Sequence, residues 1–140
     1  MGKAKSTVSW KGKMAFEAEI DGKKFMIDAD ERVGGENQGP TPKPLMLTSL
    51  AGCTGMDVVS ILKKMRVELD NFQVSVEGEL TDEHPKHFVK MMVTYEFWGK
   101  NLPLDKIKKA VDLSEERYCG VSVVYKKVMP IESEIILHEN

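Results

Sequence analysis

The sequence predicts an α+β fold, and three observations carry that prediction. Apolar residues alternate with a period of two in the first third of the chain and again near residues 72–76 and 89–97, which indicates strands. One long segment between these runs has helical spacing instead. The strands come in runs rather than in strict βαβ alternation. At 140 residues, with 41% hydrophobic and 30% charged residues, the chain is expected to form a single domain over residues 1–140.

The first third reads as a β-meander. A short strand at residues 7–10 is followed by a second, whose apolar positions share one face: Met14, Phe16, Ala18 and Ile20. Asp21-Gly22 supplies a hairpin turn, because glycine tolerates the positive φ that such turns require. A third strand carries Phe25, Ile27 and Ala29, and residues 33–40 are a loop by composition.

A long helix follows Pro42 and Pro44, since proline is tolerated in a first helical turn. Helical spacing is followed by Leu47, Leu50, Ala51, Val58, Ile61, Leu62 and Met65. Met46, Met56 and Val59 lie elsewhere on the helical wheel, so the helix is apolar on most sides and is expected to be a buried central helix. It is expected to end near residues 63–66, where basic residues suit the negative end of the helix dipole.

The second half begins with two strands joined by a polar turn at residues 81–86. The first carries Phe72, Val74 and Val76, and the second has Val89, Met91, Val93, Tyr95 and Phe97 on one face. A helix is expected after Pro103, and a final strand over residues 131–137. Residues 121–125 are ambiguous between helix and strand. We expect the sheets to be antiparallel.

Composition excludes several classes of protein. A formal net charge of −2 argues against nucleic-acid binding through bulk positive charge and against a polybasic membrane binder. Two cysteines are too few for a disulfide-stapled scaffold or a four-cysteine metal site. The most apolar stretch, residues 45–62, contains too many polar residues for a membrane span. We therefore expect a cytoplasmic protein without a nucleic-acid or membrane partner.

The two cysteines have both a structural and a chemical interpretation. Cys53 lies between Gly52 and Gly55, and each glycine inside a helix costs about 1 kcal/mol relative to alanine. That cost is explained if another helix packs across them or if a small substrate must reach the sulfur. Cys53 is otherwise a small buried apolar residue. Cys119 follows the second helix, at an element boundary from which a cysteine can reach a partner or be incidental.

Other catalytic and metal-binding patterns are weak. His84 and His87 have ligand-like spacing, but they flank Pro85 in a turn, and neither cysteine has a close second ligand in sequence. We therefore expect no metal and no bound cofactor. The sequence contains no Ser-His-Asp grouping, phosphate loop or dinucleotide fingerprint.

Three segments, considered together, resemble the OsmC/Ohr superfamily, and most closely its OsmC-like branch. They are GGENQGPTP at residues 34–42, LAGCTGMDVV at residues 50–59 and RYCGVS at residues 117–122. The resemblance covers essentially the whole chain. It implies an OsmC-like α+β fold in which two chains form an intertwined homodimer around the long helices.

The resemblance also implies a thiol-dependent peroxidase that acts on small organic hydroperoxides at the dimer interface. In it Cys53 is the peroxidatic residue, Cys119 is the resolving residue, and an external dithiol reduces their disulfide. The family uses an arginine before the central helix to stabilise the thiolate, and Arg32 matches that position. Arg32 is otherwise a solvated loop residue.

One position departs from the family. Its members commonly carry a glutamate near the start of the central helix that pairs with the arginine, and Lys43 or Pro44 stands there in this chain. Glu36 or Glu31 is the candidate for orienting Arg32 instead. The alternative function is a non-catalytic OsmC-like stress protein that binds a small apolar ligand in the dimer cleft. A KH-like nucleic-acid module gains little from a slightly acidic chain.

Overall fold

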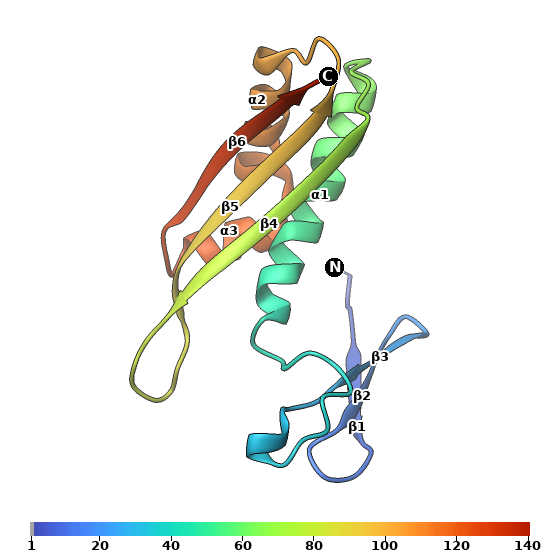
Figure 1. Cartoon of the computed structure of the whole chain (residues 1–140), viewed down its shortest axis with the longest axis vertical. Coiled ribbons are helices and arrows are strands. Elements are labelled where there is room, and N and C mark those ends of the chain that lie inside the picture. Colours follow the sequence, from blue (N-terminus) through green and yellow to red (C-terminus); the bar gives the residue numbers. More distant parts are fainter. Residues whose placement is uncertain (1) are drawn as a thin grey trace. The chain divides into compact units, whose positions relative to one another are not determined.

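The computed structural model describes residues 2–140 and forms two compact units, one running to Met46 and the other from Leu47 to Asn140. Each unit contains one three-stranded sheet (Figure 1). The predicted α+β class is confirmed, since the long helix and the two sheets occupy separate stretches of the chain.

The first unit is the expected antiparallel meander of β1 (Ser6–Trp10), β2 (Phe16–Ile20) and β3 (Lys23–Ile27). Asp21 and Gly22 form its second turn with φ angles of 50° and 77°, as the hairpin required. Paired positions place apolar side chains on one face of the sheet, and many of these are exposed: Val8, Trp10, Phe16, Ile20 and Phe25. The face is therefore left without a complete cover.

The loop after β3 is organised by one buried carboxylate. Asp28 is 3% exposed and accepts backbone hydrogen bonds from Ala29, Glu36 and Gln38 at 2.7, 3.3 and 3.1 Å. These bonds hold the pKa of Asp28 below its usual value. They close the loop around the short 3₁₀ helix Glu31–Val33, which carries Arg32.

Helix α1 (Leu45–Lys64) begins and ends where the sequence predicted, but only one stripe of it is buried. That stripe consists of Leu50, Thr54, Val58 and Leu62, which recur every four residues. Met46, Met56 and Val59 on other sides are exposed, so one chain alone does not bury the helix all round. Length and composition would allow α1 to cross a membrane, but its buried stripe packs into the apolar core of the second unit, which makes it a core helix.

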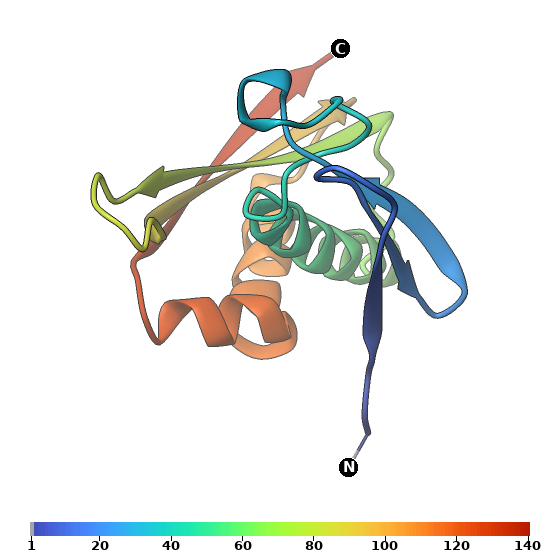
Figure 2. The same cartoon turned by 90° about the horizontal axis from the view of Figure 1, so that it is seen from below.

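The second sheet has the order β4 (Asn71–Leu80), β5 (Phe88–Gly99) and β6 (Ile131–Glu139). β4 and β5 are antiparallel, but β6 runs parallel to β5, so the expectation of purely antiparallel sheets was wrong. The reason is the connection: α2 (Leu104–Leu113), a π-helical turn (Ser114–Tyr118) and α3 (Gly120–Lys126) return the chain to the beginning of β5. α1, α2 and α3 all lie on one side of this sheet (Figure 2).

Strand β5 forms the centre of the core. Met91, Val93, Tyr95 and Phe97 are buried as the alternation predicted. Val89 is 41% exposed, contrary to that pattern, because a register shift beside Glu79 and Leu80 turns Phe88 inward instead. The ambiguous residues 121–125 belong to helix α3.

Candidate active site

Two cysteines and one carboxylate meet in the second unit. Cys53 and Asp57 lie one helical turn apart on α1, and Cys119 occupies the N-cap position of α3. The two Sγ atoms and a carboxylate oxygen of Asp57 all lie within 4.8 Å of one another. The fold thus brings together the cysteines that are far apart in the sequence.

The two sulfurs differ in their surroundings. Both cysteines are free thiols, with Cys119 fully buried and Cys53 only partly buried. Burial raises the pKa of Cys119 to about 11, and a hydrogen bond with Cys53 contributes in the same direction. Cys119 therefore keeps its proton at neutral pH, and Cys53 is the less buried of the two residues.

The backbone around Cys119 is held by the π-helical turn. The Cys119 amide donates to the Ser114 carbonyl at 2.8 Å, and Sγ of Cys119 accepts from the Ser122 amide at 3.3 Å. A disulfide needs an S–S separation of about 2.0 Å, so the two sulfurs, which lie within 4.8 Å of each other, must still move closer together to bond. The arrangement can support disulfide exchange between Cys53 and Cys119.

A buried chain of hydroxyl groups fixes this arrangement. Thr54 Oγ1 lies 2.9 Å from the Tyr95 hydroxyl and 2.8 Å from Ser114 Oγ, and Ser114 donates to Asp57 Oδ2 at 2.9 Å. We call Thr54, Tyr95 and Ser114 the hydroxyl junction. It connects α1, β5 and the π-helical turn, which are the elements that position the two cysteines.

The junction continues to a second carboxylate. The Tyr95 hydroxyl donates to Glu115 Oε2 at 2.8 Å, and Ser133 Oγ donates to the other Glu115 oxygen at 3.3 Å. Burial raises the pKa of Tyr95 far above its ordinary value, so this phenol stays a neutral donor. Within the described residues, no buried side-chain nitrogen or oxygen lacks a hydrogen-bond partner.

Arg32 lies in the other compact unit and its partner is neither of the expected glutamates. Arg32 Nη2 donates to Asp30 Oδ2 at 2.8 Å, and this contact holds the pKa of Asp30 below its usual value. Glu36 contacts Lys13 at 3.7 Å and Gln38 at 3.3 Å instead, and Glu31 begins the 3₁₀ helix. In this chain the carboxylate that orients Arg32 is thus Asp30.

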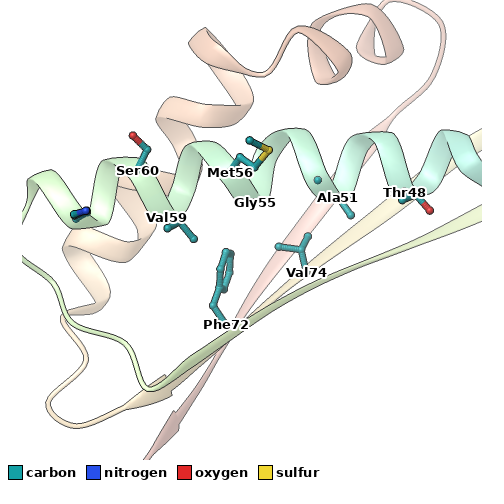
Figure 3. A pocket seen from close by; sticks show the side chains of 10 residues that line it. Thr48, Ala51, Gly55, Met56, Val59, Ser60, Phe72 and Val74 are labelled. Atoms are coloured by element: carbon teal, nitrogen blue, oxygen red, sulfur yellow. The ribbon is translucent and has the colours of Figure 1, made fainter. Parts of the chain in front are cut away.

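An apolar groove of about 730 Å³ runs beside the glycines of α1 (Figure 3). Phe72 and Val74 of β4 point from the sheet toward this face of the helix. Its lining comprises Thr48, Ala51, Gly52, Gly55, Met56, Val59, Ser60, Lys63, Phe72 and Val74. Apart from Thr48, Ser60 and Lys63, this lining is apolar.

Sequence reasoning missed Asp57 and Ser114 as site residues. Asp57 was detectable, because residues four apart share a helix face and the helix itself was predicted. Ser114 was not, because its contacts with Thr54 and Asp57 span more than fifty residues and depend on the tertiary fold. His87 was a weak metal candidate, and its Nδ1 instead contacts the Pro85 carbonyl at 2.8 Å.

Comparisons with known proteins identify the family. The family model described as OsmC-like protein matches residues 35–134. Protein YhfA of Escherichia coli K12 is 30% identical over 125 residues, which cover 89% of this chain and 90% of that protein.

Solved structures share the fold. A hypothetical protein from Aquifex aeolicus has a TM-score of 0.87 at 24% identity and covers 100% of this chain and 99% of its own. An organic hydroperoxide resistance protein OsmC from Legionella pneumophila has a TM-score of 0.71 at 14% identity, covering 97% of this chain and 98% of its own.

We expect the hydroxyl junction to contribute to the stability of the fold. Thr54→Val keeps the side-chain shape but removes the buried hydroxyl that lies between Tyr95 and Ser114 and can donate to one of them, so we expect a loss of about 1–3 kcal/mol in the free energy of unfolding. Urea titration of the reduced protein, with all variants at the same protein concentration, measures this free energy. Thr94→Val is the control, because it removes a single exposed hydrogen bond to Glu134 and should cost about 0.5 kcal/mol or less. Equal losses for both variants would contradict the role of the junction.

The raised pKa of Cys119 predicts unequal reactivity of the two thiols. The thiolate is the form that reacts with iodoacetamide, so Cys119 is expected to stay unlabelled near pH 8 and to react only as the pH approaches about 11 or after unfolding. Cys53 is expected to be labelled in the folded protein. Peptide mass mapping of the reduced protein distinguishes them, and equal labelling at pH 8 would refute the assignment.

Proposed function

The chain belongs to the OsmC-like protein family, and we propose that it is a thiol peroxidase that reduces organic hydroperoxides with Cys53 and Cys119. The observation that carries this proposal is the approach of the two sulfurs within 4.8 Å, one accessible and one buried. The fold relative from Legionella pneumophila that is named an organic hydroperoxide resistance protein supports the choice of substrate class.

The proposed reaction has two steps. The Cys53 thiolate attacks the distal peroxide oxygen, the O–O bond breaks, and the alkoxide takes a proton and leaves as the alcohol, so that Cys53 becomes a sulfenic acid. The Cys119 sulfur then attacks the sulfenic sulfur, and water leaves as the disulfide forms. An external dithiol returns both cysteines to thiols and becomes a disulfide itself.

The surroundings of the sulfurs support this division of roles. A peroxidatic cysteine must be reached by the substrate, which suits the partly buried Cys53. A resolving cysteine acts only after the first oxidation, and the buried, protonated Cys119 is protected from peroxide until then. Assigning the roles in the reverse order would require the substrate to enter the core.

Arg32 is proposed as the cation that stabilises the thiolate and the developing negative charge on the leaving oxygen. Asp30 replaces the usual family glutamate as its orienting partner, which fits the presence of Lys43 and Pro44 at the start of α1. We propose a cytoplasmic location, because a chain with only two cysteines lacks the disulfide framework that is typical of small secreted domains.

We further propose that the active protein is a homodimer. The exposed face of α1 and the exposed apolar face of the β1–β3 sheet are surfaces that a folded chain seldom leaves in water. Within the described residues, a Cβ placed on Gly52 would have no neighbour within 4 Å apart from its chain neighbours and the backbone of its own helix, so this position faces open space. A helix of a second copy packed along the groove would fill this space, and it would bury Met56 and Val59.

The alternative function is binding of a small apolar ligand without catalysis. It is favoured by the same groove, whose volume and lining suit such a ligand. This reading predicts ligand-dependent thermal stabilisation that persists when both cysteines are replaced.

Turnover of cumene hydroperoxide with a dithiol tests the peroxidase proposal. Cys53→Ser should abolish catalysed consumption of the hydroperoxide. Cys119→Ser should be oxidised once per chain and then accumulate with Cys53 as a sulfenic acid. Arg32→Ala should slow the first oxidation about 10²-fold or more, because a charge-stabilising donor is lost. Consumption of hydroperoxide by wild type and Cys53→Ser at the same rate would end the proposal.

Light scattering at micromolar concentration tests the dimer. The wild-type chain should have twice the mass of one chain, and Gly52→Leu should weaken association because leucine fills the surface on which the partner helix packs. Lys64→Leu adds a comparable apolar side chain at an exposed position outside the groove lining and should leave the mass unchanged. A monomeric wild-type protein would contradict the proposed assembly.

A further inference from the structure

We propose that the reduced protein binds one thiophilic divalent cation, of the Zn²⁺ class, through Cys53, Cys119 and Asp57. The three donor atoms already lie within 4.8 Å of one another. They come from one turn of α1 and from the N-cap of α3, both on the same side of the sheet (Figure 2). The binding itself does not depend on the proposed peroxidase reaction, although its effect on turnover does.

The donor set suits such an ion in kind and in spacing. Zn²⁺ takes sulfur, nitrogen and carboxylate oxygen ligands, and tetrahedral bonds of about 2.3 Å to sulfur and 2.1 Å to oxygen place neighbouring donors about 3.6–3.8 Å apart. The observed limit of 4.8 Å exceeds this spacing by about 1 Å. Small side-chain rotations therefore bring all three donors onto one ion, with the fourth position left for water.

Hydrogen bonds behind the donors support a built site. Asp57 Oδ2 accepts from Ser114 at 2.9 Å, which orients the carboxylate and leaves its other oxygen available. Cys119 Sγ accepts from the Ser122 amide at 3.3 Å. Oriented ligands of this kind are typical of metal centres, in which partners of the ligands set their direction. Asp57 has no role in the two proposed peroxidase steps, and metal binding would be a second role beside its hydrogen bond with Ser114.

The cation and the hydroperoxide would exclude each other. When a cation is bound, the Cys53 sulfur donates to it the lone pair that would otherwise attack the peroxide. Conversely, conversion of the two thiols to a disulfide removes two of the three ligands, and the two electrons go to the hydroperoxide, which leaves as alcohol and water. In the metal-bound state the two thiols are thus protected from oxidation, and oxidation of the thiols releases the ion.

Titration of the reduced, reductant-free full chain with Cd²⁺ tests the site, because cadmium–thiolate bonds have an ultraviolet charge-transfer absorption. We expect one Cd²⁺ per chain with this absorption, displaced by Zn²⁺. Asp57→Asn should weaken Cd²⁺ binding at least about tenfold. Cys53→Ser and Cys119→Ser each leave a single thiolate, so the absorption of a site with two thiolates should be lost in both. Asp112→Asn, which removes an exposed carboxylate on α2, should bind as wild type does.

Three further measurements serve as controls. Circular dichroism must show that each variant is folded, and Ser114→Ala, which leaves all three donors in place, should weaken binding less than Asp57→Asn. Protein oxidised with one equivalent of hydroperoxide should bind no Cd²⁺. Absence of the charge-transfer absorption from folded wild type, or equal affinity in Asp57→Asn and Asp112→Asn, would overturn the site. Hydroperoxide turnover is assayed separately, so the Cd²⁺ titration tests the metal site even if the protein has no peroxidase activity.

Discussion

The hydroxyl junction of Thr54, Tyr95 and Ser114 is the interaction on which the candidate site depends. All three side chains are almost completely buried, and within the described residues their side-chain partners are one another and the carboxylates of Asp57 and Glu115. Such groups are stable in a core only as a complete set, because a buried hydroxyl without a partner costs about 1–3 kcal/mol. The junction therefore fixes α1, β5 and the π-helical turn in one arrangement. Cys53 directly precedes Thr54, and Cys119 ends the turn that Ser114 begins, so the same constraint brings the two sulfurs together.

Burial then separates the chemistry of the two thiols. Cys119 is fully buried in the core of the second unit, while Cys53 lies on helix α1, which is covered along a single stripe. The uncovered side of α1 carries the apolar groove and the glycines, which is where we place the second copy of the chain. Access to Cys53, protection of Cys119 and the incomplete burial of α1 are thus consequences of one arrangement. Arg32, the proposed cation, belongs to a loop that Asp28 closes and is oriented there by Asp30.

Local patterns predicted most of the elements, whereas contacts between distant residues escaped prediction. Alternation along residues 91–97 and helical spacing over residues 45–64 reflect burial on one face, which any single element records in its own sequence. The parallel pairing of β6 was missed because it depends on the helical connection, and the reversal of Val89 and Phe88 was missed because a bulge is not visible in alternation. The cysteines were candidates from the residues themselves, whereas their roles and the choice of Arg32 came from the family resemblance. Asp57 and Asp30 were not predicted, because each acquires its partner, Ser114 or Arg32, only in the folded chain.

The central claim is that the fold holds Cys53 and Cys119 ready to form a disulfide within one chain. Mass mapping after treatment of the reduced protein with one equivalent of cumene hydroperoxide, followed by alkylation and digestion without reductant, tests this most directly. The account predicts a single cross-linked peptide pair that joins Cys53 to Cys119 of the same chain, with the loss of two hydrogens. Recovery of both cysteines as alkylated thiols, a disulfide between chains, or Cys53 as a sulfinic acid beside a free Cys119 would contradict it.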